Sequence, residues 1–429
     1  MRADQHAQIQ GTHDIRVDRR ISVGEHIEMC RKERRLSRRI LANLVGRSEE
    51  WLRLVETGRQ PLDSVKVIMA LADVLRIDDI STLISVPGQR AHDMLHPAPA
   101  GDPGARATIR ALHAPPTTPG TITDTTTLER ELLRCRDLWF ASPRRHRQTM
   151  ARLPDLLTSA RHLRLVRDDA TVRRVLPQIY NLTSQALLAT HHRHEALLAA
   201  DRALEDTLTH PGSLAHLVAS WHLTAALLHT PAADTALRVA SAALPEPALA
   251  ESGATTDLAA VAGAVRALAA RAAATIADTE SCDELLTTAA TLADRLGGQR
   301  SVQGVVFGPG ELGLARMETA LAQRNPHDAI AAAADTDLPA DCPIASRSRY
   351  HVVLAHSFAV THQDVAATYE LTKAAACGED ELRYDADAQR TLQLLLRREN
   401  PVLRAELSRL TAAARPATRA RPRCSPPHA

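Results

Sequence analysis

The sequence predicts an all-α protein with a small N-terminal domain and a longer array of helical hairpins. Only 10 of its 429 residues are aromatic, while the apolar share is 45% and consists mainly of alanine, leucine and valine. Alanine and leucine favour closely packed helices, whereas β-sheets draw on β-branched and aromatic residues. Helix-length apolar segments separated by proline or glycine also recur from about residue 128 to 410.

Five zones follow from shifts in composition along the chain. Residues 1–20 are polar and predict a disordered lead, and residues 21–86 form a compact block with apolar periodicity. Residues 87–126 are rich in proline, glycine and threonine, which is typical of a semi-rigid linker. Residues 127–412 hold the helical hairpins, and residues 413–429 form a basic, proline-rich tail that we expect to be disordered.

The compact block opens with two short helices. Apolar residues share one face of a helix over residues 23–34. Ser37 is a favourable N-cap for a second helix over residues 38–45. The predicted inward face of this second helix consists of Ile40, Leu41, Leu44 and Val45.

Three more helices complete the block. Gly46 and Arg47 break the second helix, and Ser48 is placed to cap a third helix over residues 49–56. Gly58 ends that helix, as glycine commonly does at a helix C-terminus. The inward face of a fourth helix consists of Val65, Ile68, Ala72 and Leu75. A short fifth helix is predicted over residues 80–84.

Two short helices joined by a turn of three to four residues, inside a five-helix unit, match the geometry of a helix-turn-helix domain. In that geometry the second helix of the pair enters the major groove of DNA, while the first crosses the backbone. The local charge agrees, since residues 16–66 carry 13 basic and 8 acidic side chains, whereas the whole chain has 52 and 50. The block therefore predicts contact with double-stranded DNA.

The segment LSRRILANLVGRSEEWLRLVETGRQP resembles the Xre/lambda-repressor-type helix-turn-helix family, and the resemblance covers residues 21–86. The residues at the family's spacings are Leu36, Ser37, Leu41, Ala42, Val45, Gly46, Ser48, Leu52, Val55, Glu56 and Gly58. The resemblance implies that Arg38 contacts a phosphate and that Arg59 meets the DNA backbone. It places Ser48, Glu49, Glu50, Arg53 and Leu54 on or near the groove face. With Arg47 from the turn, these are the candidate DNA-binding residues.

Some residues depart from the family pattern. Glu49 and Glu50 stand where many relatives have amide side chains, and phosphates repel carboxylates, although a glutamate can accept from cytosine N4. Arg47 replaces a commonly apolar turn residue, and Trp51 is expected to pack against the protein. The alternative is a helix-turn-helix remnant that mediates only protein contacts, beside a repeat region that serves as an interaction scaffold.

The region after residue 127 predicts stacked helical hairpins. In RYHVVLAHSFAVTHQDVAATYELTKAAACGED, residues fall at the offsets of the ~34-residue tetratricopeptide (TPR) repeat. They are Ala355, Phe358, Ala367, Leu371 and Ala374. Weaker copies place Ala196, Ala200, Ala203, Ala329 and Ala333 at the small positions of second helices. Because one hairpin cannot bury its apolar face alone, such hairpins stack into a TPR-like α-solenoid.

The whole chain resembles Xre-type regulators with a C-terminal TPR-like domain. This resemblance implies a sequence-specific transcriptional regulator that binds an operator, with the TPR-like domain serving dimerisation, ligand sensing or both. A homodimer is expected because one small DNA-binding unit makes too few contacts for tight specific binding. Similar quorum-sensing regulators bind a signalling peptide in the TPR groove through asparagine side chains, and only Asn181 and Asn325 lie well inside the repeats. Three alternatives remain open for the TPR-like domain: it binds a peptide, it binds a protein partner, or it binds no ligand.

No catalytic, cofactor or metal site is predicted. His191, His192 and His194 share one predicted turn and lack the HExxH spacing that puts two imidazoles on one helical face. The Gly308-Pro309-Gly310 segment lacks a phosphate-loop motif. An enzyme with an unrecognised site is the remaining rival.

Other features indicate a cytoplasmic protein with no membrane contact. The six cysteines lie far apart, no apolar run approaches about 18 residues, and the N-terminus lacks a secretory signal. The arginine-rich segment that contains Arg144, Arg145 and Arg147 predicts either a solvated helix start or a surface that pairs with acids.

Overall fold

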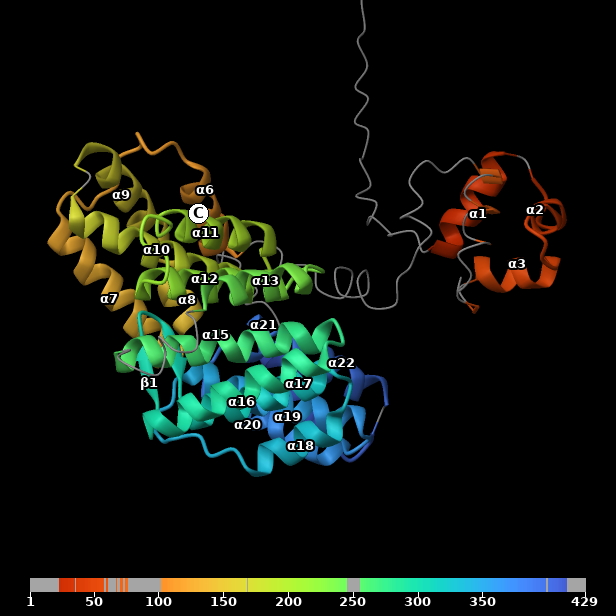
Figure 1. Cartoon of the computed structure of the whole chain (residues 1–429). Helices are drawn as coiled ribbons and strands as arrows, with labels where there is room; N and C mark the ends of the chain where they lie inside the picture. The colour runs from red at the N-terminus through yellow and green to blue at the C-terminus, as the bar shows by residue number, and fades with distance from the viewer. Residues whose placement is uncertain are drawn as a thin grey trace, which may run out of the picture. The chain divides into compact units, whose positions relative to one another are not determined.

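The computed structural model describes residues 23–34, 36–57, 59–60, 67, 70–71, 74–75, 102–167, 169–244, 255–398 and 400–414. Within these residues the protein is all-α apart from one short β-hairpin, as the composition predicts (Figure 1). The chain divides into two compact units, Met1–Pro97 and Ala98–Ala429. The first is a helix-turn-helix domain and the second is a TPR-like α-solenoid. The predicted lead over residues 1–20 and the tail beyond residue 414 lie outside the described residues.

The N-terminal unit contains α1 (Val23–Glu33), α2 (Arg38–Leu44) and α3 (Glu49–Glu56). Each begins at the predicted residue and ends at it or one residue earlier. The two predicted caps are present, because the backbone N–H groups of Ile40 and Trp51 donate to Ser37 Oγ at 3.2 Å and Ser48 Oγ at 3.1 Å.

A buried apolar cluster holds these helices together. Its largest members include Ile27, Leu41, Leu52, Leu71 and Leu75, all at most 1% exposed. Of the predicted inward face of the fourth helix, Leu75 is therefore confirmed, while Val65, Ile68 and Ala72 lie outside the described residues. Gly58 and the predicted fifth helix over residues 80–84 also lie outside them.

The predicted inward face of α2 is wrong at two positions. Leu41 and Val45 are buried, but Ile40 is 50% exposed and Leu44 is 57% exposed. The seven residues of α2 turn by about 100° per residue, so only one narrow stripe faces α3 and the apolar cluster. Ala42 completes that stripe, and Ile40 and Leu44 lie together on the solvent side.

The C-terminal unit begins with α6 (Pro103–His113), α7 (Thr125–Ala141), α8 (Arg145–Met150) and α9 (Leu153–Val166). Helical hairpins follow: α10 (Ala170–Ala189) with α11 (Arg193–Glu205), α12 (Leu214–Leu228) with α13 (Ala233–Ala243), α15 (Thr256–Thr275) with α16 (Thr279–Leu296), α17 (Pro309–Ala322) with α18 (Pro326–Ala334), and α19 (Ile344–Val360) with α20 (Asp364–Cys377). The described part ends with α21 (Glu381–Tyr384), α22 (Ala386–Arg397) and α23 (Arg404–Ala414).

The small residues at the predicted TPR positions are buried where helices cross. Ala355, Ala367 and Ala374 are 0% exposed in the hairpin of α19 and α20. The weaker copies agree, since Ala196, Ala200, Ala203, Ala329 and Ala333 are all at most 5% exposed. Small side chains therefore let successive helices approach closely, which confirms the predicted hairpin stacking.

The predicted linker over residues 87–126 is wrong where the structure describes it. Asp102 accepts from the N–H groups of Gly104 and Ala105 and so caps α6. Thr108, Ala111 and Leu112 of α6 are buried, and this helix packs against α9. Burial against a helix about 50 residues later stabilises α6 despite its proline-rich flanks. Residues 87–101 lie outside the described residues.

A short antiparallel β-hairpin, β1 (Arg300–Val302) and β2 (Val305–Phe307), joins α16 to α17. No pattern in the sequence predicts this β-hairpin. Phe307 is 1% exposed and packs on Gly263 of α15, where a Cβ atom would lie 2.1 Å from the phenylalanine ring. The hairpin therefore belongs to the core of the repeat domain.

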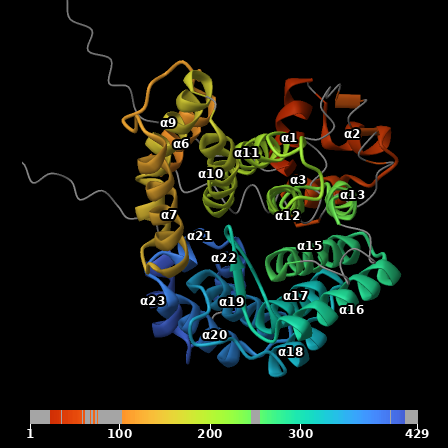
Figure 2. The ribbon, with the colours of Figure 1, turned by 60° about the vertical axis from the view of Figure 1, so that its left-hand side comes forward.

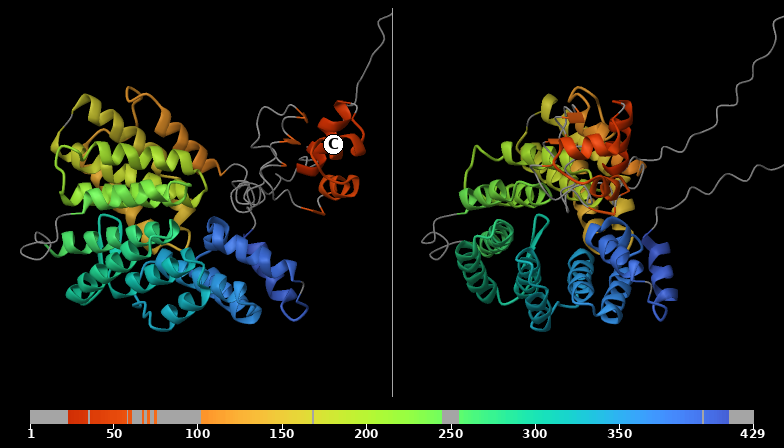
Figure 3. Two further views of the ribbon diagram at one scale, coloured as in Figure 1. Left: turned by 45° about the vertical axis from the view of Figure 1, so that its right-hand side comes forward. Right: turned by 90° about the vertical axis from the view of Figure 1, so that its right-hand side faces the viewer.

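Helices near the two ends of the repeat domain meet: the start of α6 and α8 lie against α21. Figure 2 shows the hairpins following a curve, with α15, α17 and α19 on its inner side and α16, α18 and α20 on its outer side. Figure 3 shows the same curve from two further directions. A set of side chains joins its ends, and we call it the clasp: Asp102, Arg144, Arg145, Glu379, Glu381 and Tyr384.

Charged contacts hold the clasp. Arg145 Nε lies 2.6 Å from Glu381 Oε1, and both side chains are at most 10% exposed. Arg144 Nε donates to both oxygens of Glu379 at 2.9 Å, and Tyr384 Oη donates to Asp102 Oδ2 at 2.6 Å. The acid-pairing surface predicted for the arginine-rich segment is therefore present at Arg144 and Arg145.

One described helix, α15, is long and apolar enough to span a membrane by length and composition alone. However, 72% of its apolar window is buried inside the repeat domain, where it packs against α12, α13, α16 and α17. The burial explains its hydrophobicity as that of a central core helix.

Candidate nucleic-acid interface

Helix α3 is held with one face in the core and the opposite face in solvent. Leu52, Val55 and Glu56 are buried. The turn that presents α3 depends on Gly46, whose φ of +68° is left-handed and suits glycine. The predicted groove-facing residues lie on the displayed side: Ser48, Glu49 and Glu50 are exposed, and Arg53 and Leu54 are half-buried.

Arg53 and Glu50 pair along this displayed face. Arg53 Nε donates to Glu50 Oε2 at 2.7 Å, and Arg53 Nη2 donates to Glu50 Oε1 at 2.6 Å. The hydrogen bonds raise the pKa of Arg53 and lower that of Glu50. Glu50 therefore occupies the guanidinium that a guanine edge would need, so a base contact by Arg53 requires an exchange of partners.

Arg47 and Arg59 lie on either side of α3 in the sequence, and both are exposed. The Arg47 guanidinium lies 5.6 Å from the ring centroid of Trp51, a cation–π arrangement. Trp51 is half-buried and packs against the apolar cluster, in line with its predicted structural role. The backbone N–H of Arg59 donates to the Leu54 carbonyl at 2.9 Å, which fixes the chain just beyond α3.

Arg38 is already engaged inside its own domain. Its Nε donates to Glu56 Oε2 at 2.6 Å, and its Nη2 donates to Glu28 Oε1 at 3.2 Å. Arg31 Nε donates to Glu56 Oε1 at 2.6 Å. These four residues, the Glu56 cluster, link all three helices, and the bond to Glu56 raises the pKa of Arg38.

The Glu56 cluster changes the interpretation of Arg38. Its side chain is 36% exposed, so a phosphate contact stays a prediction, but the same guanidinium also has a structural role. The sequence does not predict this role, because the partners are 10 and 18 residues away. One signal was available: Glu56 follows the buried Leu52 by four residues and therefore lies on the inward stripe of α3.

A second group of charged residues lies on the inner side of the repeat domain. Glu318 of α17 accepts from Arg271 Nη1 at 3.0 Å and from Arg349 Nε at 2.5 Å. Arg349 Nη1 also donates to Asp387 Oδ2 at 2.6 Å, and Asp387 pairs with Arg390. Burial raises the pKa of Glu318, but Arg271 and Arg349 outweigh it and lower that pKa, so the carboxylate stays ionised.

The two asparagines considered for peptide binding differ in the structure. Asn325 caps α18, because its Oδ1 accepts from the Asp328 N–H at 3.4 Å. Asn181 of α10 is 2% exposed, and its Oδ1 has no hydrogen-bond partner among the described residues. His222 Nε2 of the adjacent helix α12 is also buried without one. Asn181 thus keeps an unused amide oxygen, whereas Asn325 serves the fold.

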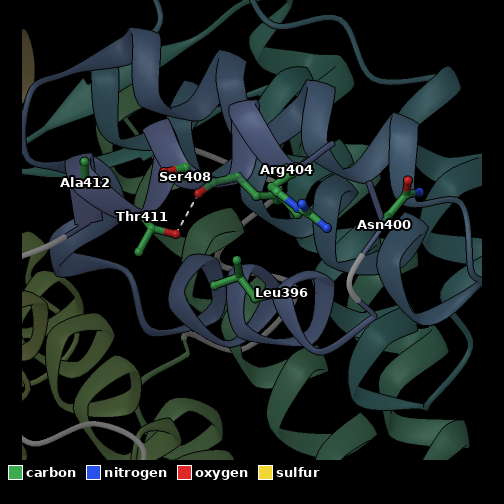
Figure 4. Close-up of a pocket in the computed structure, with 7 residues that line it drawn as sticks. Leu396, Asn400, Arg404, Ser408, Thr411 and Ala412 are labelled. Carbon is green, nitrogen blue, oxygen red and sulfur yellow. Dashed lines mark hydrogen bonds between the residues drawn. The ribbon is translucent and has the colours of Figure 1, made fainter. Parts of the chain in front are cut away.

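A pocket of about 620 Å³ lies between the end of α22 and α23, away from these residues. Figure 4 shows Leu396 facing Arg404 and Thr411 across it. Thr411 Oγ1 donates to the Leu407 carbonyl at 2.6 Å, so that hydroxyl is already used within its helix. No pattern in the sequence predicts this pocket.

No group of three or more His, Cys, Asp or Glu residues is placed to hold a metal ion in the part of the chain that the structure describes. His191 and His192 occupy the turn between α10 and α11, as predicted, and His191 has a φ of +63°. His194 lies in the first turn of α11.

Comparison with known proteins identifies the N-terminal domain. Residues 22–82 match a family described as a helix-turn-helix domain. A structure of PlcR from Bacillus thuringiensis in complex with the peptide PapR7 and DNA is 10% identical, with a TM-score of 0.31, and the match covers 82% of this chain and 99% of PlcR. The apo form of the competence regulator ComR from Streptococcus vestibularis is 13% identical, with a TM-score of 0.21, covering 92% and 98%. No curated protein matches the chain.

Proposed function

We propose that the chain is a sequence-specific DNA-binding transcriptional regulator of Xre type, whose TPR-like domain serves dimerisation, ligand sensing or both. The observation that carries this proposal is the presentation of α3. Ser48 caps the helix, Leu52 and Val55 anchor it, and its opposite face stays in solvent. A helix anchored in this way is able to enter a major groove, with Arg47 and Arg59 near its two ends for the phosphates.

The repeat domain supplies the second half of the proposal. Polar and charged groups lie on three of its first helices: Asn181 of α10 is buried, and Arg271 of α15 and Arg349 of α19 are partly exposed. An unpaired buried amide is costly unless something pairs with it. A signalling peptide, which offers backbone N–H groups to Asn181, is the ligand that we favour over a protein partner. A homodimer would present two recognition helices, one to each half-site of the operator.

The DNA-binding proposal is tested by selecting bound sequences from random duplexes with the full chain, followed by gel shifts. Removing a base contact with Arg53→Ala should cost about 1–3 kcal/mol and relax one base position. Arg59→Ala should weaken all sequences alike and reduce the slope of log affinity against log salt by about 1. Arg238→Ala is the matched control, since Arg238 is 74% exposed on α13 of the other unit.

The scaffold alternative has its own supporting observation, the carboxylates of Glu49 and Glu50 on the displayed face. It predicts that selection enriches no sequence and that Arg53→Ala and Arg59→Ala behave like Arg238→Ala. That result would contradict DNA reading by α3. Sedimentation of the chain with its selected duplex tests the dimer, because two protein chains should bind each duplex.

A further inference from the structure

The pocket between α22 and α23 has the size and the apolar lining of a small-molecule site. Its volume of about 620 Å³ lies within the range of about 300–1,000 Å³ that ligand pockets occupy. Leu396, Leu407 and Ala412 supply the apolar part of its lining. Leu396 is 40% exposed there, so a ligand with an apolar part gains free energy by removing this leucine from water.

Hydrogen-bond donors gather at one end of the pocket. Arg404, the first residue of α23, is exposed and extends its guanidinium toward Asn400 (Figure 4). Asn400 Oδ1 accepts from the Val402 N–H at 3.1 Å, which leaves the amide NH₂ group of Asn400 to donate. Arg404 forms no ion pair with any acid of the residues that the structure describes. This end of the pocket therefore offers a guanidinium and an amide to a ligand.

The charge of Arg404 is not balanced within the pocket. None of the described residues that line the pocket is acidic. Glu406 follows Arg404 by two residues, but it accepts from Thr372 Oγ1 of α20 at 2.7 Å and also pairs with Arg409. Glu406 thus belongs to the contact between α20 and α23. A lone positive charge in a partly enclosed site attracts an anion and repels a cation.

The length of the pocket argues for a small occupant. Its lining on α23 begins at Arg404 and ends at Ala412, and this stretch of helix spans about 12 Å. An extended peptide covers that length with only about four residues. Ser408 lies between them and is exposed, and its small side chain leaves the space open. These dimensions favour a small molecule over a segment of another protein.

The segment that follows α23 in the sequence is a poor occupant. Residues 415–429 contain four arginines and no aspartate or glutamate. Their charge has the same sign as that of Arg404, so the two repel each other. Charge complementarity therefore requires an occupant that brings its own anionic group.

We propose that this pocket binds a small organic acid. The carboxylate lies at Arg404 and Asn400, and the apolar part lies along Leu396 and Leu407. A guanidinium binds a carboxylate through paired N–H donors, which fixes the orientation of the acid in the pocket. The proposal does not depend on DNA binding, and its residues lie on other helices than Asn181 of α10, so the pocket is a separate ligand site of the repeat domain.

The test is isothermal titration calorimetry of the full chain with sodium octanoate, sodium acetate and 1-octanol in the same buffer. Octanoate has both an apolar part and a carboxylate, whereas each of the other two probes has only one of them. We expect octanoate to bind, and acetate and 1-octanol to bind at least about tenfold more weakly. A chain that does not bind octanoate, or that binds 1-octanol as tightly as octanoate, would overturn the proposal.

Variants place the binding in this pocket. Arg404→Gln should weaken octanoate binding about tenfold, because it removes a charged hydrogen-bond donor. Arg397→Gln is the matched control, since Arg397 is exposed at the end of α22 and does not line the pocket. Ser408→Phe should abolish binding by filling the pocket. Because Ser408 is exposed, this variant should unfold at the same temperature as the unchanged chain, which verifies its fold.

Two results would contradict the site even if octanoate binds. One is equal affinity of Arg404→Gln and Arg397→Gln for octanoate. The other is unchanged affinity of a folded Ser408→Phe variant. Either result would place the octanoate elsewhere on the chain and leave the proposed DNA binding unaffected.

Discussion

Glu56 shows how one charged side chain organises the DNA-binding unit. It is 3% exposed, yet it accepts hydrogen bonds from Arg31 on α1 and Arg38 on α2. A buried carboxylate is tolerated only when paired in this way. The cluster therefore sets the position of α3 against the two preceding helices, and through it the angle at which the groove-facing residues are displayed.

Replacing Glu56 tests this role. Glu56→Gln removes the charge that compensates two arginines, and breaking a buried pair by removing one partner typically costs about 3–5 kcal/mol. We expect a loss of that order in the free energy of unfolding of the N-terminal unit, measured by urea unfolding with Trp51 fluorescence. The matched control is Glu50→Gln on the exposed face of α3, where solvent screens the pair with Arg53 and its loss should change stability little. Similar midpoints for the two variants would contradict the structural role of Glu56.

At this scale the sequence predicted local interactions and missed distant ones. Ser37 and Ser48 are predictable as caps because a helix cap acts locally: each serine accepts from a backbone N–H only three residues away. The pairing of Arg31 with Glu56 spans 25 residues and leaves no local pattern. The sequence therefore predicts a DNA contact for Arg38 but not its contact with Glu56.

At the scale of elements, α1 and α3 meet through Gly24. A Cβ atom at Gly24 would lie 2.4 Å from the carbonyl oxygen of Val55 and 2.5 Å from that of Glu56. Both obstacles are backbone atoms, which cannot rotate away. The absence of a side chain at Gly24 is thus a condition for the close packing of these two helices.

Gly24→Ala should therefore destabilise the N-terminal unit. In an isolated helix, replacing glycine by alanine stabilises the helix by roughly 0.5–1 kcal/mol, whereas forcing an extra methyl group into a close contact costs about 1–3 kcal/mol. Because the second effect is larger, we expect a lower unfolding midpoint for the N-terminal unit and weaker DNA binding. Gly298→Ala is the control, because a Cβ at Gly298 meets nothing within 4 Å. An unchanged or higher midpoint for Gly24→Ala would disprove the close approach.

Helices are predicted correctly where the apolar periodicity extends over many residues. They are missed where the local composition is typical of a linker. The hairpin of α19 and α20 follows from alanine and leucine positions that the structure buries. Helix α6 was missed because its proline- and glycine-rich flanks outweighed a helix start at Asp102 with a proline directly after it. The strands β1 and β2 hold three residues each, too few for a period-two pattern to stand out.

At the scale of the repeat domain, the clasp turns an open array into a closed one. A solenoid normally has contacts only between neighbouring repeats, so its end repeats have free faces. Here Arg145 and Glu381 pair across 236 residues, and the His146 ring meets Trp139 edge-on and Tyr384 at a tilt. Such a pair cannot be predicted from spacing, although the division into two units and the hairpin stacking could.

Breaking the clasp should loosen both ends of the repeat domain together. Glu381→Gln leaves Arg145 without its buried counter-charge, which typically costs about 3–5 kcal/mol. We expect faster amide hydrogen exchange in α6, α7 and α8 as well as in α21. Glu379→Gln removes the exposed pair with Arg144 and should change exchange little. Faster exchange confined to α21 would show that the clasp does not couple the ends.

The clasp also imposes an order on the synthesis of the protein. Arg144 leaves the ribosome 235 residues before Glu379, its partner in the clasp. At translation rates of 5–20 residues per second, that interval lasts roughly 10–50 s. Throughout it, the ring of His146 lacks the contact with Tyr384 that it makes in the folded protein. For that interval the nascent chain therefore lacks Glu381 and Tyr384, the partners of Arg145 and His146 in the finished protein.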